Sequence, residues 1–209
     1  MLDFRLLAIS NNNDVSEERG VAYVVEEFRR FADAGIRAYQ LREKSWTDRM
    51  RFHTAQSLVA LARSYDSHVI INDRADIAAM TGATGVHLPE AGLTVPDARH
   101  ILPTRLIGVS CHSLNAALNA EITGADYILF GPIYDTESKR AFGPPRGIEA
   151  LREVCERVAI SVFAIGGVTP RRAEECRVAG AHGVAVIGAL QADDLDHIVK
   201  EFHNSLGGL

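Results

Sequence analysis

The stretch Val162-Phe-Ala-Ile-Gly-Gly-Val-Thr-Pro170 is a short apolar run that ends in two glycines and opens onto helix-compatible sequence. Gly183-Val-Ala-Val-Ile-Gly188 repeats this pattern one unit later. A buried strand that ends in glycine before a helix presents free backbone N–H groups to an anion. Two such units near the C-terminus predict a phosphate site after the last two strands of a (β/α)8 barrel. Its expected members are Gly166, Gly167, Ile187 and Gly188.

Short apolar runs alternate with longer amphipathic segments along the whole chain. Strands are expected at 4–9, 36–41, 68–71, 84–87, 105–109, 125–130, 160–165 and 182–187. Helices are expected at 17–34, 47–64, 74–81, 95–101, 113–123, 147–156, 170–179 and 191–205. Strict alternation predicts a parallel sheet. Eight units without a long polar linker favour one α/β domain over residues 1–209, a closed TIM barrel of near-minimal length, with a doubly wound open sheet as the alternative.

Capping residues mark where several of these helices begin and end. Thr47, Ser113, Thr169 and the pair Asn72-Asp73 each precede a predicted helix. Their side-chain oxygens can accept from the free N–H groups of a first helical turn. Glycines at the expected helix ends suit the left-handed conformation that is common there: Gly35, Gly82, Gly124 and Gly180.

Composition is ordinary for a globular protein, with 47% hydrophobic and 23% charged residues. The formal net charge of −5 gives no bulk attraction to nucleic acid or to an anionic membrane, so neither is an expected partner. Cys111, Cys155 and Cys176 lack metal-ligand spacing and indicate a reducing compartment. We find no charged-then-apolar leader and no apolar run near the roughly 18–20 residues of a membrane span, so a cytoplasmic protein is expected.

Polar side chains follow the predicted strands at the barrel end where such folds carry their chemistry. Gln40, Arg42 and Lys44 would point to one side if the second strand runs that far. Two cations and an amide in a barrel mouth indicate an anionic ligand. The alternative is that the strand ends at Leu41 and that the following residues form a surface loop.

The next three strands end in further candidates. Asp73, after Asn72, either caps the next helix or binds Mg²⁺. Glu90 follows the fourth strand and could act as an acid or base, or be a solvated loop residue. His87 within that strand is interpreted as an interior histidine. Ser110 after the fifth strand can donate to a ligand oxygen.

Two more features concern possible nucleophiles and a phosphate clamp. Cys111 and His112 are neighbours that point to opposite faces of a strand, so a nucleophilic pair is not expected. The longest loop follows the sixth strand and contains Thr136, Ser138 and Lys139. These three resemble a hydroxyl-plus-ammonium phosphate clamp, on a mobile lid or a plain surface connection.

Together these motifs resemble, in order, those of the thiamine phosphate synthase/TenI family. The matching stretches are Gln40-Leu-Arg-Glu-Lys44, Asn72-Asp-Arg74, Gly85-Val-His-Leu88, Ile107-Gly-Val-Ser110, Gly124-Ala-Asp-Tyr127, Gly131-Pro-Ile-Tyr-Asp-Thr-Glu-Ser-Lys139 and Ala164-Ile-Gly-Gly-Val-Thr169. The match covers nearly the whole chain. It implies a small (β/α)8 barrel that works in thiamine biosynthesis.

The resemblance also implies roles for single residues. In the synthase, a pyrimidine methyl diphosphate ionises to a carbocation and Mg-bound pyrophosphate, and the thiazole nitrogen captures the cation. The implied pyrophosphate contacts are Arg42, Lys44, Asn72 and Lys139, the pyrimidine contacts are Gln40 and Ser110, and the Mg²⁺ ligand is Asp73. The implied thiazole phosphate contacts are Thr136, Ser138, Gly167 and the loop at Ile187-Gly188.

The chain lacks one functional residue of each branch of the family. The synthase follows Gly-Val-His-Leu with Gly-Gln-Glu-Asp, whose Asp is a second metal carboxylate, whereas this chain has Pro89-Glu-Ala-Gly92. Glu90 could compensate only if the loop were rebuilt. The TenI branch includes a thiazole tautomerase that moves a proton without a metal. Its histidine after the strand-6 glycine is replaced here by Pro132.

The missing carboxylate at Gly92 favours a TenI-like thiazole tautomerase without a cofactor. Its acid–base group would be His112 or Glu90, with Ser110 and Lys139 as further catalytic candidates. One alternative is a thiamine phosphate synthase with Mg²⁺ on Asp73 alone, and another is a non-catalytic binder of a phosphate ligand. The expected small molecules are thiazole phosphate and, for a synthase, the pyrimidine diphosphate. A homodimer would be the commonest assembly.

Overall fold

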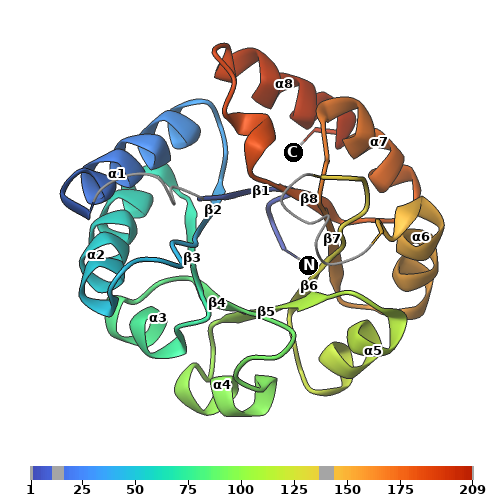
Figure 1. Ribbon diagram of the computed structural model, residues 1–209, viewed down its shortest axis with the longest axis horizontal. Coiled ribbons are helices and arrows are strands. Elements are labelled where there is room, and N and C mark those ends of the chain that lie inside the picture. The colour runs from blue at the N-terminus through green and yellow to red at the C-terminus, as the bar shows by residue number, and fades with distance from the viewer. Residues whose placement is uncertain (1, 11–16, 137–143, 209) are drawn as a thin grey trace.

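Eight parallel strands close into a barrel in chain order (Figure 1). The computed structural model describes residues 2–10, 17–136 and 144–208. The strands are β1 (Leu6–Ile9), β2 (Ala38–Leu41), β3 (His68–Asn72), β4 (Gly85–Leu88), β5 (Leu106–Cys111), β6 (Tyr127–Phe130), β7 (Ser161–Ile165) and β8 (Gly183–Val186). β1 pairs with both β2 and β8, where Leu7 lies opposite Ala185, so the sheet has no open edge. The (β/α)8 prediction is confirmed and the open-sheet alternative is excluded.

Helices surround the barrel and alternate with its strands (Figure 1). They are α1 (Glu17–Asp33), α2 (Asp48–Tyr65), α3 (Ala75–Thr81), α4 (Val95–Ile101), α5 (Leu114–Ile122), α6 (Gly147–Arg157), α7 (Pro170–Val178) and α8 (Leu195–Ser205). The predicted last helix at 191–205 is too long at its start. A 3₁₀ helix, η2 (Gly188–Leu190), follows β8, and α8 begins only at Leu195, where the Asp194 carboxylate accepts from the His197 N–H at 3.0 Å.

Three of the four predicted N-caps are confirmed. The side chains of Thr47, Ser113 and Thr169 each accept from a backbone N–H three residues further on. The glycines at the predicted helix ends all have positive φ: Gly35, Gly82, Gly124 and Gly180. Only glycine adopts this region without a steric cost, which explains why these helices stop where they do.

The cap expected at Asn72-Asp73 is wrong. The N-cap position of α3 is Arg74, which makes no side-chain capping hydrogen bond. Asn72 instead accepts from the Gln40 side chain, and Asp73 turns the chain out of β3 with a φ of 64°. A left-handed aspartate is uncommon outside turns and functional sites. Both side chains are therefore available to the barrel mouth rather than to the helix.

Apolar side chains fill the barrel and also pack its outer face against the helices. The inner cluster consists of Phe4, Leu7, Ile9, Ala38, Ile70, Tyr127, Leu129, Phe163 and Ala185. Burying a side chain such as Phe163 contributes about 1.5–3 kcal/mol. Two members of this cluster, Ile9 and Leu129, also line the cavity described below. The filled barrel thus forms the floor of that cavity.

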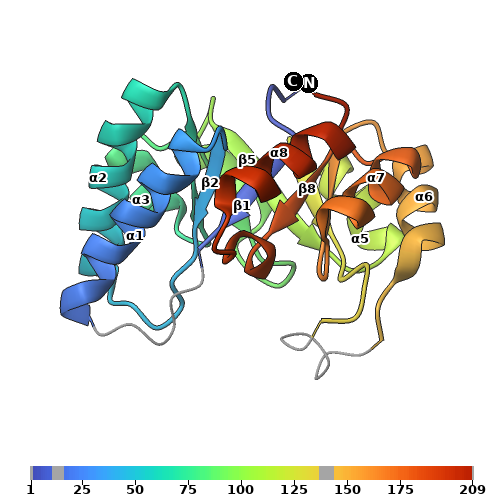
Figure 2. The same ribbon diagram turned by 90° about the horizontal axis from the view of Figure 1, so that it is seen from above.

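The two ends of the barrel carry different parts of the chain (Figure 2). The chain starts and finishes at one end, and the loops after β2 and β6 extend from the other. Parallel strands of a closed barrel have all their carboxyl ends at one rim. Side chains that follow different strands therefore meet around one opening. Within residues 2–10, 17–136 and 144–208, no helix is long and apolar enough to cross a membrane.

Candidate active site

A cavity of about 460 Å³ lies at the carboxyl ends of the strands. It brings together candidates that lie far apart in the sequence: Gln40, Arg42, Lys44, Asn72, Asp73, Glu90, Ser110, His112 and Ile187. Ile9, Leu129 and Ile165 provide an apolar floor. A concave site with an apolar base and a few convergent polar groups is typical of small-molecule sites.

Gln40 and Asn72 form a hydrogen-bonded amide pair at this cavity. Gln40 is only 1% exposed, and its Nε2 donates to Asn72 Oδ1 at 3.1 Å. The other polar atom of the amide, Gln40 Oε1, is buried and has no hydrogen-bond partner among the described residues. A buried acceptor without a donor is costly. Gln40 is therefore prepared to accept a hydrogen bond from a ligand donor.

His87 is an interior histidine, as the sequence predicts. It is 2% exposed, and its ring nitrogens lie 2.9 Å from Ser110 Oγ and 3.3 Å from Tyr127 Oη. Burial lowers the pKa of His87 to about 3, so the ring is neutral near pH 7. A neutral imidazole has one donor and one acceptor nitrogen, which matches two hydroxyl partners. His87 thereby orients Ser110 at the edge of the cavity.

Glu90 and His112 form a pair that the sequence did not predict. Glu90 Oε2 lies 2.5 Å from His112 Nδ1 and accepts from the His112 backbone N–H at 3.0 Å. Both side chains are 42% exposed and both line the cavity. The two residues follow adjacent strands, which is how a separation of 22 positions becomes a direct contact. A carboxylate on Nδ1 orients an imidazole for proton transfer at Nε2.

Cys111 belongs to the large apolar cluster and is not among the residues that line this cavity. It is fully buried, and burial raises the pKa of its thiol to about 12. A thiol with such a pKa supplies almost no thiolate near neutral pH, so it is not an activated nucleophile. This high pKa supports the expectation that Cys111 and His112 form no nucleophilic pair.

The residues after β2 form a loop, as one sequence interpretation predicts, but they also line the barrel mouth, as the other predicts. The strand ends at Leu41, yet Arg42, Glu43 and Lys44 all line the cavity. Ser10 Oγ accepts from the Arg42 backbone N–H at 2.8 Å and holds the start of this loop. Burial lowers the pKa of Arg42, although its guanidinium remains charged at neutral pH. Two cations therefore stand at one side of the mouth.

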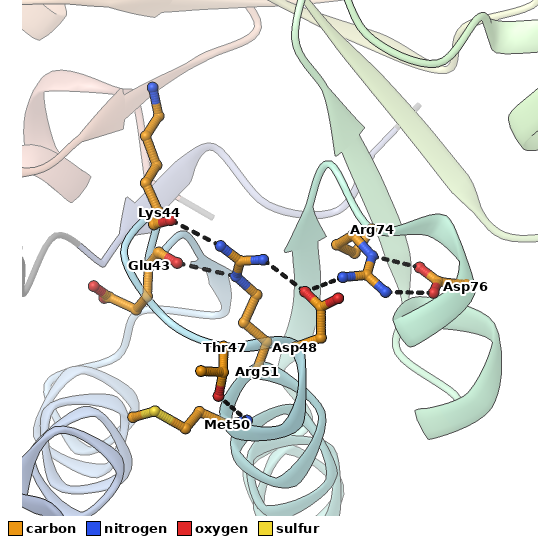
Figure 3. Close-up of polar contacts among 8 residues, drawn as sticks. All are labelled: Glu43, Lys44, Thr47, Asp48, Met50, Arg51, Arg74 and Asp76. Carbon is orange, nitrogen blue, oxygen red and sulfur yellow. Dashed lines mark hydrogen bonds and ion pairs between the residues drawn. The ribbon is translucent and has the colours of Figure 1, made fainter. Parts of the chain in front are cut away.

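Three charged residues to which sequence reasoning gave no role support this loop, and two of them, Arg51 and Arg74, also line the cavity (Figure 3). Arg51 donates to the carbonyl oxygens of Glu43 and Lys44 and to the Asp48 carboxylate. Asp48 also pairs with Arg74, the residue after Asp73. The spacing of Asp48 and Arg51 at the start of a helix was the only available sequence signal, and it is common on helix surfaces.

The Gly166-Gly167 turn packs against the loop after β6. Both glycines have positive φ, 97° and 65°. A β-carbon on Gly166 would lie 2.6 Å from Pro132 Cβ, and one on Gly167 would lie 2.8 Å from the Asp135 carbonyl oxygen. The Tyr134 N–H donates to the Gly166 carbonyl at 3.1 Å. Glycine is thus required here to seat the β6–α6 loop, a reason that the phosphate-cradle interpretation did not include.

Gly188 differs from the other two glycines of the predicted phosphate site. Its φ lies outside the left-handed region, and a β-carbon there would meet no described atom within 4 Å. The fold of the described residues therefore does not require glycine at this position. Open space at the start of η2 suits the close approach of a ligand to the backbone. Thr136 belongs to the β6–α6 loop, and Ser138 and Lys139 lie outside the described residues.

A metal site can be assessed at Asp73. A β-carbon on Gly92 would lie 3.3 Å from Asp73 Oδ1, so position 92 faces this carboxylate. Among the residues that the structure describes, no group of three or more His, Cys, Asp or Glu side chains could hold a metal ion. Mg²⁺ often binds through one or two protein carboxylates together with substrate phosphates and water. A single carboxylate, that of Asp73, is therefore compatible with a Mg²⁺ ion whose other ligands come mainly from a diphosphate and water.

Comparisons with known proteins agree on one family. A family model described as thiamine monophosphate synthase, TMP-TENI, matches residues 6–190. A thiamine-phosphate synthase of Chlorobium phaeobacteroides is 42% identical over 76% of this chain and 77% of that protein. One of Shouchella clausii is 38% identical over 92% and 90%. A solved thiamine phosphate pyrophosphorylase of Pyrococcus furiosus has a TM-score of 0.85 at 32% identity, covering 97% of this chain and 95% of that one.

These names favour the synthase alternative over the tautomerase that the sequence favoured. Both named relatives are called thiamine-phosphate synthases, and their match to this chain covers at least three quarters of their length. The glycine at position 92 is compatible with this alternative. The physical reason is that Mg²⁺ can take most of its ligands from a diphosphate, so one protein carboxylate does not exclude a metal-assisted reaction.

Proposed function

Because the chain belongs to the thiamine monophosphate synthase family of thiamine biosynthesis, we propose that it joins a pyrimidine methyl diphosphate to a thiazole phosphate and releases pyrophosphate. In this reaction the C–O bond to the diphosphate breaks and its electron pair leaves with the oxygen. The lone pair of the thiazole nitrogen then forms the new C–N bond. No net proton transfer is needed.

The observation that carries this proposal is the composition of one cavity. The cations of Arg42 and Lys44 line the same space as the amide of Gln40 and the hydroxyl of Ser110. A leaving diphosphate requires positive charge where its negative charge develops, and an aminopyrimidine requires buried hydrogen-bonding groups. The cavity offers both.

On the diphosphate side, Arg42 and Lys44 would neutralise the leaving group, and Asn72 would donate to a phosphate oxygen. The Asp73 carboxylate would hold Mg²⁺, which when bound supplies further positive charge to the diphosphate. On the pyrimidine side, Gln40 Oε1, which has no hydrogen-bond partner in the described part of the chain, would accept from an amino group. Neutral His87 would keep Ser110 oriented toward the ring.

The thiazole phosphate would lie near the loops after β6, β7 and β8. Gly188 leaves open space beside the start of η2, and Ile187 lines the cavity. Thr136 and Gly167 stand on loops that pack against each other. Ser138 would contact the thiazole phosphate and Lys139 the pyrophosphate, as the resemblance implies. In this arrangement the thiazole nitrogen would approach the pyrimidine from the side opposite Arg42.

A second candidate is thiazole tautomerisation, and the Glu90–His112 pair favours it. The synthase reaction needs no protein acid or base, whereas moving a proton on a thiazole carboxylate phosphate does. The 2.5 Å contact between His112 Nδ1 and Glu90 provides an oriented imidazole at the cavity. This pair would perform the acid–base role of the TenI histidine, whose position in this chain is occupied by Pro132.

The test is to incubate purified protein with both substrates and Mg²⁺ and to measure thiamine phosphate. Formation of thiamine phosphate at a rate that depends on Mg²⁺ is expected. His112→Gln and Glu90→Gln should leave this rate within about threefold, because the reaction needs no acid–base group. No product from the wild type, together with aromatisation of the thiazole carboxylate that His112→Gln abolishes, would replace the synthase by the tautomerase.

A further inference from the structure

We propose that Arg51 is a positioning residue for the diphosphate cations. It holds the backbone of the loop that carries Arg42 and Lys44, and through Asp48 it joins that loop to the one that carries Asp73. This inference rests on the proposed function for the identity of the anion. Arg51 itself is not expected to touch the substrate.

The donor groups of Arg51 are directed at protein acceptors (Figure 3). Nε donates to the Glu43 carbonyl at 3.0 Å, Nη2 to the Lys44 carbonyl at 2.9 Å, and Nη1 to Asp48 Oδ1 at 3.0 Å. A planar guanidinium can serve three acceptors in fixed directions. The side chain is 22% exposed, so these contacts are partly shielded from water.

The loop after β2 is therefore anchored at three successive residues. The Arg42 N–H donates to Ser10 at 2.8 Å, and the carbonyls of Glu43 and Lys44 accept from Arg51. Segments that follow a strand are usually mobile unless their backbone groups are bound. Holding the backbone here fixes where the two cationic side chains start. Charges that are positioned before the reaction stabilise a developing anion without reorganisation.

Asp48 extends this support to the next loop. Its Oδ1 contacts both Arg51 and Arg74. Arg74 also makes two hydrogen bonds to Asp76, Nε at 2.9 Å and Nη2 at 2.6 Å. The neighbour of Arg74 is Asp73, whose left-handed backbone sets the direction of the proposed Mg²⁺ ligand. One connected set of hydrogen bonds and ion pairs thus supports both the loop with the two cations and the loop with the carboxylate of the proposed diphosphate site.

The distribution of charge separates supporting from binding residues. Arg51 and Arg74 are matched by Asp48 and Asp76, and the hydrogen bond from Arg74 holds the pKa of Asp48 below its usual value. These two arginines are therefore largely neutralised within the protein. Arg51 and Arg74, whose donor groups are directed at protein acceptors, line the same cavity as Arg42 and Lys44. An incoming diphosphate would meet the latter pair.

The experiment compares Arg51→Lys with the wild type by titration calorimetry with inorganic pyrophosphate and Mg²⁺. Lysine keeps the charge but cannot reach three acceptors with one ammonium group. The affinity for pyrophosphate should fall about tenfold, as for other residues that orient a site through its ligand-binding groups. Binding of thiazole phosphate should stay within about twofold, because its loops lie elsewhere. Arg63→Lys, an exposed arginine near the end of α2, is the matched control and should bind both as the wild type does.

Two results would overturn the proposal. One is wild-type pyrophosphate affinity in Arg51→Lys, and the other is an equal loss for both ligands, which would indicate general structural damage. Asp48→Asn is the second variant, because it keeps an acceptor for Arg51 while weakening the pair with Arg74. Asp48→Asn should reduce the affinity for pyrophosphate. The double variant Arg51→Lys/Asp48→Asn should bind pyrophosphate within about twofold of Arg51→Lys alone, since both residues act through one network.

These measurements distinguish this inference from the proposed function. If the wild type binds pyrophosphate and Arg51→Lys loses affinity, but no thiamine phosphate forms, the reaction is wrong and the positioning role stands. If thiamine phosphate forms and the variant binds and reacts normally, the reaction stands and the positioning role is wrong.

Discussion

Position 92 faces the carboxylate of Asp73, because a β-carbon built on Gly92 would lie 3.3 Å from Asp73 Oδ1. The same β-carbon would lie 2.6 Å from Cγ of Pro89, whose carbonyl accepts from the Gly92 N–H at 3.1 Å. The proline ring thus occupies space that a side chain at 92 would need. Pro89 and Gly92, two of the residues in this turn that differ from the synthase pattern, are therefore sterically linked.

Replacing both residues, Pro89→Gly with Gly92→Asp, should create a second carboxylate beside Asp73. We expect the affinity for Mn²⁺ or Mg²⁺ to rise about tenfold, because a two-carboxylate site has more charge for a hard cation. Gly92→Asp alone should gain less and should lower the free energy of unfolding by about 1–3 kcal/mol, since the proline ring opposes it. Titration calorimetry and urea unfolding of the two variants and the wild type test this. Equal metal affinity in all of them would show that position 92 does not reach the metal.

Gln40→Met should weaken binding of the pyrimidine diphosphate. The variant keeps the shape of the side chain but removes Oε1, the buried acceptor without a partner. Losing a hydrogen bond to a buried group costs about 1–3 kcal/mol, so the KM for this substrate should rise at least about fivefold. The KM for thiazole phosphate should not change. Gln56→Met, on an exposed position of α2, serves as the control, and an unchanged KM in Gln40→Met would remove this residue from the site.

Two glycines should respond differently to alanine. Gly167→Ala should lower the free energy of unfolding by at least about 1–2 kcal/mol, because its φ is 65° and the new β-carbon would crowd Asp135. Gly188→Ala should be nearly neutral for stability, since its β-carbon would meet nothing within 4 Å. It should nevertheless weaken binding of thiazole phosphate several-fold. Normal ligand affinity in Gly188→Ala would move the phosphate away from η2.

The buried His87 should make stability fall in acid. Its pKa is lowered from 6.5 to about 3 by burial, so between these values the unfolded chain binds a proton that the folded chain does not. The contribution is fully present above pH 6.5 and is lost as the pH falls toward 3, at up to about 1.4 kcal/mol per pH unit. His87→Gln should flatten this acid limb.

The measurement is urea unfolding of wild type and His87→Gln from pH 8 to pH 5. The slope of the free energy of unfolding against pH is compared, because this removes the constant cost of the hydrogen bonds that the variant loses. Other histidines with lowered pKa, His182 and His203, are present in both proteins and cancel. Parallel curves for the two proteins would mean that His87 is not buried in its neutral form.

Local pattern was sufficient for the architecture and for most of the cavity. The alternation of apolar runs with amphipathic segments, and glycines such as Gly82 and Gly124 at helix ends, predicted the strands and helices because both signals act within a few residues. The rule that parallel strands share one rim then placed Gln40, Arg42 and Ser110 in one opening. The motif order identified the family for the same reason, since it is read along the chain.

Only the tertiary structure decided what these residues contact. The pairing of Glu90 with His112, the approach of position 92 to Asp73 and the support of the β2 loop by Arg51 depend on loop paths and side-chain directions. Those are set by packing between elements, which no local periodicity encodes. The glycines at 166 and 167 show the difference most directly. Their sequence indicated a strand followed by a helix, and the fold alone revealed that the loop after β6 packs into the space that their missing side chains leave.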